Sequence, residues 1–146
     1  MNWAGHAIER LKDYESRKNA AENLESQIEL LEDKFTSIRS ATTDATPVQG
    51  GTENRREKML IENIATREEL FTNLDFIKRE IEITEKGLEA LTENERKILH
   101  WFYINRPRDY VDRLCNDLFV SKTELYRQRE TALKKFTKAC YGIVEI

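Results

Sequence analysis

The chain has 146 residues, enough for one ordinary domain or for a small domain with an elongated appendage. Charged residues make up 35% and hydrophobic residues 39%, with only 5 Gly and 2 Pro, so the composition favours long solvated helices over a sheet-rich globule. The formal net charge of -3 divides into -6 for residues 1–91 (13 Lys/Arg against 19 Asp/Glu) and +3 for residues 92–146 (11 against 8). We therefore expect an all-α protein whose positive charge is concentrated near the C-terminus.

The N-terminus lacks a basic, apolar, small-residue signal, and no apolar run approaches the roughly 20 residues needed to span a bilayer. We expect a cytoplasmic protein without a membrane partner. The two cysteines, Cys115 and Cys140, and the two histidines, His6 and His100, have no metal-ligand or disulfide spacing. There is no glycine-rich phosphate loop either, so we expect no catalytic residue, no metal and no cofactor.

The first predicted element is a helix over residues 4–40. Its apolar residues alternate at four and three positions, which keeps one seam of the helix apolar. The following residues, 41–54, contain Pro47, Gly50 and Gly51 among small polar side chains, and they predict a flexible loop. The seam of this first helix consists of Leu24, Ile28, Leu31, Phe35 and Ile38.

The second predicted element is a helix over residues 55–90, equal in length to the first. Two equal helices around a flexible loop predict an antiparallel hairpin or coiled coil over residues 1–90. An alternative is that the seams pair between chains, as an intermolecular coiled coil or a bundle of two hairpins. Homodimerisation through the hairpin therefore stays open. The predicted seam consists of Leu60, Ile64, Leu70, Leu74, Ile77, Ile81, Thr84 and Leu88.

Three shorter helices are predicted for residues 91–146. The stretch from Thr92 to Glu95 matches a capping box and starts a helix that stops before residue 105, because Pro107 disfavours helical geometry in the residue before it. A short helix follows over residues 109–118, then a tight connection. A second capping box, Ser121 to Glu124, starts the last helix. Two short helices around a tight turn predict a helix-turn-helix domain.

The last helix has a polar face suited to DNA. Residues 121–138 contain six basic and two acidic residues, a net +4. In a helix-turn-helix, the first turns of the second helix enter the major groove, where long, polar and unpaired side chains read base edges. Lys122, Thr123, Tyr126 and Arg127 have the spacing for that role, while Lys134, Lys135 and Lys138 suit phosphate contacts. Arg106 and Arg108 are expected to clamp the DNA backbone from the other side.

The segment LTENERKIL at residues 91–99, together with residues 112–136 ending in ALKKF, resembles region 4 of bacterial sigma factors. In that family, an LTxxER helix start precedes a helix-turn-helix whose recognition helix ends in ALxKL. The resemblance implies that Lys122, Thr123, Tyr126 and Arg127 face a promoter element near −35. The sequence departs from the family at Phe119, where a turn glycine is usual, and at Cys115, a small-residue position.

Nearly the whole chain, including FTSIRSATTDATPVQGG and FYINRPRDYVDRLC, is similar to a family of prophage proteins from Gram-positive bacteria allied to the RinA/ArpU-type regulators. This resemblance implies a phage or prophage transcriptional regulator, an activator of late genes. Its partners would be double-stranded DNA and host RNA polymerase. A stand-alone sigma factor is disfavoured, because the acidic N-terminal hairpin has no aromatic and basic face for melting DNA.

Two other functions remain as alternatives. A DNA-packaging protein resembling a terminase small subunit also combines a helix-turn-helix with helical oligomerisation elements, although such proteins usually place the DNA-binding unit first. A structural coiled-coil adaptor would explain the seams, but it leaves the +4 charge of the last helix without a role.

Overall fold

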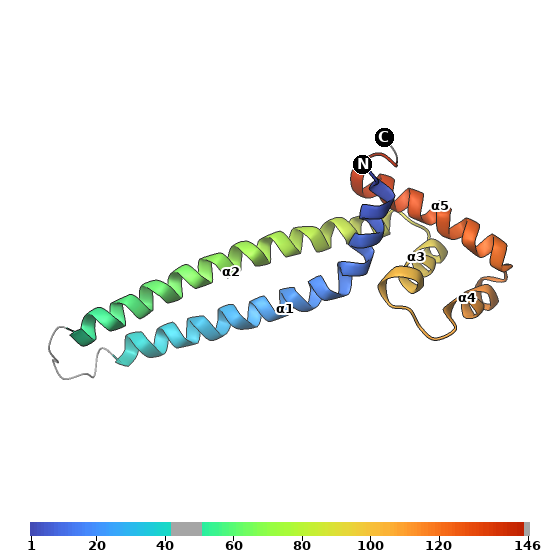
Figure 1. The fold of residues 1–146 in the computed structure, drawn as a ribbon. Coiled ribbons are helices and arrows are strands. Elements are labelled where there is room, and N and C mark those ends of the chain that lie inside the picture. Colours follow the sequence, from blue (N-terminus) through green and yellow to red (C-terminus); the bar gives the residue numbers. More distant parts are fainter. Residues whose placement is uncertain (42–50, 145–146) are drawn as a thin grey trace. The chain divides into compact units, whose positions relative to one another are not determined.

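The computed structural model describes residues 1–41 and 51–144, and side chains at 51 and 52 are outside that description. The predicted all-α class is confirmed, since every regular element in these residues is helical (Figure 1). No described helix is both long enough and apolar enough to cross a membrane. The elements are α1 Trp3–Ala41, α2 Gly51–Glu89, α3 Glu93–Leu99, the π-helix η1 His100–Ile104, α4 Tyr110–Leu118 and α5 Lys122–Tyr141.

The helix bounds follow the predicted ones closely except at the start of α2. This helix begins at Gly51 rather than at residue 55, and Glu53 lies in its first turn, where a carboxylate interacts favourably with the helix dipole. Residues 51–54 are therefore helical, contrary to the prediction of a loop over 41–54. The rest of that predicted flexible loop, residues 42–50, lies outside the described residues.

The chain divides into two compact units. The head unit contains residues 1–18 and 79–146, and the hairpin unit contains residues 19–78. Both long helices contribute to both units. The division differs from the predicted boundary after residue 90, because the first 18 residues belong with the C-terminal helices.

In the hairpin unit, later residues of α1 contact earlier residues of α2, as expected of antiparallel helices (Figure 1). Lys78 Nζ lies 3.0 Å from Glu25 Oε1 near one end, and the Arg67 guanidinium lies 4.9 Å from the centre of the Phe35 ring further along. The buried seam between the two helices contains Ala21, Leu24, Ile28 and Leu74.

One position of the seam differs from its prediction. Asn63 is buried at 7% exposure, whereas Ile64 is 41% exposed. Counting back from Leu74 in alternating steps of four and three passes through Arg67 and Asn63, so residue 64 falls outside the heptad register. Asn63 meets its hydrogen-bonding needs by donating from Nδ2 to the Leu31 carbonyl at 2.9 Å and accepting from Arg67 Nε at 2.8 Å.

The core of the head unit has two hydrophobic clusters, and the first includes the start of α1. Ala7 and Leu11 have no exposed surface, and they pack with Leu91, Leu99, Ala132, Leu133 and Phe136. The second cluster lies between α3, η1, α4 and α5. It contains Ile98, Phe102, Leu114 and Leu125. Burial of Leu11 among C-terminal side chains is the physical reason that residues 1–18 join this unit.

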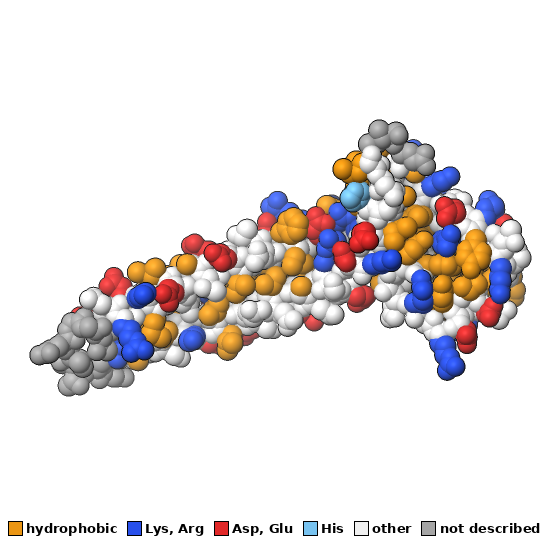
Figure 2. All heavy atoms as spheres, viewed as in Figure 1, with side chains coloured by type: hydrophobic (Ala, Val, Ile, Leu, Met, Phe, Trp, Pro, Cys, Tyr) orange, Lys and Arg blue, Asp and Glu red, His pale blue; other side chains and the backbone are white. Residues whose placement is uncertain are grey.

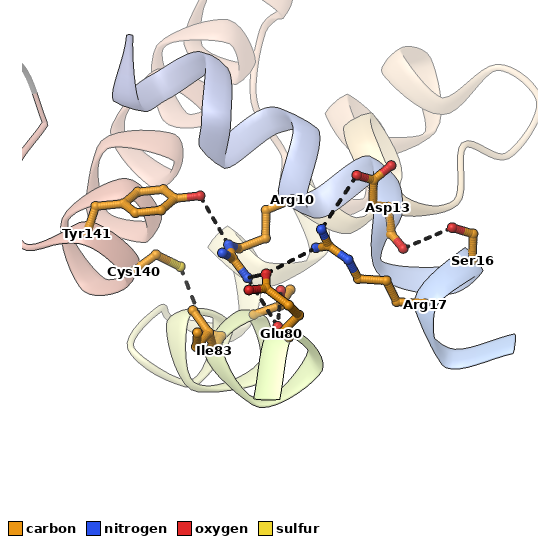
Figure 3. Close-up of polar contacts among 9 residues, drawn as sticks. Arg10, Asp13, Ser16, Arg17, Glu80, Ile83, Cys140 and Tyr141 are labelled. Atoms are coloured by element: carbon orange, nitrogen blue, oxygen red, sulfur yellow. Dashed lines mark hydrogen bonds and ion pairs between the residues drawn. The ribbon is translucent and has the colours of Figure 1, made fainter. Parts of the chain in front are cut away.

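A polar network also fixes the start of α1 in the head unit (Figure 3). Arg10 donates from Nε to the Tyr141 hydroxyl at 3.1 Å and lies 2.8 Å from Glu80 Oε2 through Nη1. Arg17 Nη1 lies 3.7 Å from the same carboxylate. Although burial alone would lower the pKa of Arg10, Tyr141 and Glu80 raise it above its ordinary value. One guanidinium thus connects α1 with α2 and with the end of α5.

Both cysteines are free and half-buried. Burial raises the pKa of Cys140 to about 11, and its Sγ lies 3.9 Å from the Ile83 carbonyl (Figure 3). The thiol is therefore protonated at neutral pH and behaves as a small hydrophobic side chain.

Candidate nucleic-acid interface

Helices α4 and α5 are joined by a two-residue turn and a helix cap. Phe119 has left-handed backbone angles, φ 56° and ψ 46°, which explains why a glycine is the usual residue at such a turn. The Val120 N–H closes the turn by donating to the Cys115 carbonyl at 3.1 Å. The Phe119 side chain is 94% exposed. The phenylalanine is therefore compatible with the tight turn but adopts a conformation that costs free energy.

The two predicted capping boxes have different outcomes. At Thr92 both halves form: Glu95 N donates to Thr92 Oγ1 at 3.2 Å, and Thr92 N donates to Glu95 Oε1 at 3.0 Å. At Ser121 only the hydroxyl half forms, with Glu124 N donating to Ser121 Oγ at 3.2 Å. The Glu124 carboxylate instead accepts hydrogen bonds from Arg127 and Gln128, so the prediction of a full second capping box was wrong.

The face of α5 opposite its core side chains is a polar stripe. Leu125, Ala132 and Phe136 have no exposed surface. Successive residues of a helix are about 100° apart, so the side chains on the opposite face can be identified by counting. They are exposed, and each lies three or four positions after the one before it. We call them the α5 stripe: Thr123, Arg127, Thr131, Lys134 and Lys138.

Tyr126 lies at the edge of the core rather than on the α5 stripe. Its ring packs 6.1 Å from the Phe102 ring in an edge-on arrangement, and the Arg129 guanidinium lies 5.0 Å from its centre. The side chain nevertheless remains 41% exposed. The predicted base-reading set therefore includes one residue that also serves packing.

Several cations that were predicted to be unpaired have acidic partners. Arg127 Nε donates to Glu124 Oε2 at 2.8 Å, which helps to lower the pKa of Glu124 to about 2. Lys122 Nζ lies 3.7 Å from Asp112 Oδ1, although both of these side chains are 69% exposed. Since exposed pairs of this kind stabilise a protein only weakly, these two cations can exchange partners readily.

Lys135, by contrast, is held by a half-buried acid of another helix. Its Nζ lies 3.0 Å from Glu95 Oε2, and the Glu95 side chain is only 12% exposed. Burial alone would raise the pKa of Glu95, but hydrogen bonds from Thr92 and Lys135 hold it below its ordinary value. This pair joins α3 to α5 and gives Lys135 a structural partner, while its side chain stays 52% exposed and its phosphate contact stays a prediction.

The two arginines before α4 also differ from each other. Arg106 donates from Nη2 to the Phe102 carbonyl at 3.0 Å and stacks 4.6 Å from the centre of the Tyr110 ring. It therefore closes the end of η1, although the residue remains exposed. Arg108 is exposed, as are Lys134 and Lys138, and none of the three has an acidic partner within 4 Å among the residues that the structure describes.

Trp101, which is not among the site residues predicted from the sequence, has charged surroundings. Its ring lies 4.9 Å from Lys97 Nζ and 4.9 Å from the Arg113 guanidinium carbon. Lys97 is also 3.0 Å from Asp117 Oδ2. The Lys97–Trp101 spacing of four on one helix was a usable signal, but the approach of Arg113 from α4 was not visible in the sequence. Figure 2 shows Lys and Arg side chains around the hydrophobic surface of this part of the chain.

Within the described ranges, no group of three or more His, Cys, Asp or Glu side chains is arranged to hold a metal ion. The exposed side chains of α4 and α5 include cations and hydroxyls as well as the carboxylates of Asp112, Asp117 and Glu130. The cations and hydroxyls suit phosphate and base contacts.

Residues 37–137 match the DUF1492 family, described as a protein of unknown function. The match covers more than half of the chain. The chain belongs to this family. No curated protein and no solved structure matches it significantly.

Proposed function

We propose that this DUF1492 member is a phage or prophage DNA-binding transcriptional regulator, an activator of late genes, that binds double-stranded DNA through α4 and α5. The observation that carries the proposal is the α5 stripe, which begins directly after a tight left-handed turn and a serine cap. A capped helix with exposed polar side chains in its first turns has the form of a recognition helix. A regulator of this kind acts in the cytoplasm.

Base reading is proposed for the first turns of the stripe. Arg127 would leave Glu124 and donate twice to the O6 and N7 atoms of a guanine, an interaction that contributes about 1–3 kcal/mol to discrimination. Its pair with Glu124, three residues apart on one helix, is exposed to solvent and therefore weak, so it competes little with a guanine. Thr123 would offer its methyl group to a thymine or its hydroxyl to a base edge.

Phosphate binding is proposed for Lys134, Lys138 and Arg108, which combine exposure with the lack of an acidic partner noted above. Lys122 joins them if it leaves Asp112. Such contacts hold the register of the protein on DNA without reading sequence. The hairpin unit is proposed to contact host RNA polymerase, because promoter binding alone does not recruit or activate the enzyme.

The proposal is tested by fluorescence-anisotropy titration of the full chain at two salt concentrations. The two DNAs are duplexes from upstream of the late genes in its own operon and random duplexes of equal length. We expect tighter binding to the upstream DNA. Arg127→Ala should reduce binding to that DNA by about 1–3 kcal/mol and leave the random duplex nearly unaffected. Lys134→Ala should weaken both complexes equally and lower the salt slope by about 1.

Lys58→Ala is the matched charge control, because Lys58 is an exposed lysine of the hairpin unit. It should change neither affinity. Equal losses on both duplexes for Arg127→Ala would contradict base reading. Weak wild-type binding to both duplexes that falls steeply with salt would contradict a sequence-specific regulator and favour the packaging alternative.

A further inference from the structure

A groove runs along one side of the hairpin unit. Its apolar floor and wall include Leu24, Ile77 and Phe76, and the Phe76 side chain is 62% exposed. Small or amide side chains form the rest of the lining. None of these lining residues is charged, although 35% of all residues in the chain are charged. The lining consists of Ala20, Asn23, Leu24 and Gln27 from α1 and Thr72, Asn73, Phe76 and Ile77 from α2.

The opposite side of the same helix pair has an ion pair beside the exposed ring of Phe71. Glu25 lies two positions after Asn23, and Lys78 lies two positions after Phe76. Two residues correspond to about 200° around a helix axis, so the Lys78–Glu25 ion pair of 3.0 Å bridges the helices away from the groove. The two sides of the hairpin therefore differ, and the ion pair lies outside the uncharged lining of the groove.

The charge of the hairpin restricts what covers this groove. Residues 19–78 contain 12 Asp/Glu and 7 Lys/Arg, a net charge of -5, which repels DNA and acidic proteins. Two copies of the hairpin would also repel each other wherever their acidic surfaces met. An uncharged strip is the surface on which two such copies can approach, and depletion of charge is typical of the core of protein interfaces.

The groove is also self-complementary, because it contains a projecting aromatic ring and a small residue to receive one. A two-fold interface uses the same patch on both subunits, so it needs both features within that patch. We propose that the groove is the dimer interface of this protein, with Phe76 seated over Ala20 of a second copy. The amides of Asn23, Gln27 and Asn73 lie at the rim, where they can hydrogen-bond across the two-fold axis.

Burial in the hairpin unit supports the same arrangement. Its seam side chains Ala21, Leu24, Ile28 and Leu74 remain 5–9% exposed, since two helices cover each other on only one face. A second hairpin over the groove would make four helices around a common core, an arrangement that buries apolar side chains from all sides. Figure 2 shows hydrophobic side chains reaching the surface along the hairpin. This dimerisation does not depend on DNA binding by the head unit.

The experiment is sedimentation equilibrium of the full chain over a wide concentration range, for the wild type and for two variants with the same chemical change. Phe76→Glu places a charge in the groove. Phe71→Glu is the matched control, because Phe71 is 49% exposed and lies five positions before Phe76, on the side of the Lys78–Glu25 pair. Circular dichroism shows whether both variants retain their helices.

We expect a wild-type dimer, a dissociation constant about tenfold or more higher for Phe76→Glu, and little change for Phe71→Glu. Ala20→Trp fills the receiving site and should also weaken the dimer. A wild-type protein that stays monomeric over the whole range would overturn the proposal, as would a dimer that Phe76→Glu leaves intact. Greater dissociation by Phe71→Glu than by Phe76→Glu would place the interface on the other side and also overturn it.

Discussion

The head unit and the hairpin unit each contain part of the same two long helices, but they differ in how completely they bury side chains. In the head unit, Leu11, Leu99, Leu125 and Phe136 have no exposed surface. In the hairpin unit, no hydrophobic side chain in the described ranges is less than 5% exposed. Several helices enclose a core from all directions, whereas two helices leave both flanks open to solvent.

The difference suggests a division of roles. The closed core of the head unit holds α5 in a defined position, as its proposed role in DNA recognition requires. The open flanks of the hairpin unit leave large apolar side chains at the surface, where they are available to partners. Those at least 39% exposed are Leu30, Met59, Ile61, Ile64, Phe71 and Phe76.

The largest expected effect is the loss of a core side chain from the head unit. Leu125→Ala should lower the free energy of unfolding by about 2–5 kcal/mol through a cavity that the packed surroundings cannot close. Leu24→Ala in the hairpin should cost about half as much, because Leu24 borders an open groove. Trp3 and Trp101 both belong to the head unit, so tryptophan fluorescence reports its urea unfolding, and circular dichroism reports both units. Equal losses would contradict the contrast between the cores.

A second effect tests how closely α5 approaches α2. A Cβ atom on Gly87 would lie 2.6 Å from Cys140 Sγ and 2.8 Å from the Phe136 ring. Gly87→Ala should therefore destabilise the head unit by about 1–3 kcal/mol in thermal unfolding, despite the higher helix propensity of alanine. Gly5→Ala is the control, since the three atoms nearest to its Cβ would all belong to the exposed side chain of Asn2. A stabilised Gly87→Ala variant would show that the two helices are farther apart.

The turn before α5 offers a stabilising change. Phe119→Gly should raise the free energy of unfolding by about 1 kcal/mol, because it removes left-handed strain and the exposed ring contributes little burial. Asp109, with φ 54°, is the matched position, and Asp109→Gly should yield a smaller gain because aspartate tolerates this conformation better. A less stable Phe119→Gly protein would indicate that the ring makes a stabilising contact.

The smallest effect concerns the Arg127–Glu124 pair at the proposed interface. The hydrogen bond from Arg127 lowers the pKa of Glu124 from 4.5 to about 2, so the pair persists above the ordinary pKa and is lost as the pH falls through about 2. An NMR titration of the Glu124 carboxyl carbon should show this midpoint, and Arg127→Ala should return it towards 4.5. A wild-type midpoint near 4.5 would mean that Arg127 is unpaired in solution.

The candidate site illustrates where prediction from sequence stops. The positions of Thr123, Arg127, Lys134 and Lys138 on one exposed face follow from helical spacing, which the sequence displays directly. The attachment of Lys135 to Glu95, 40 positions away, does not. The face of a helix on which a residue lies follows from periodicity, but its partner depends on which other helix packs beside it.

Local signals thus determined the helices of this protein and most of their ends. Thr92 and Ser121 cap helices because the hydroxyl bonds a backbone N–H three residues away, and Pro107 acts on its immediate neighbour. The tertiary structure decided that Leu11 packs with Phe136 and that Asn63, not Ile64, enters the seam. These outcomes depend on contacts between distant segments, whose free energy no short stretch of sequence contains.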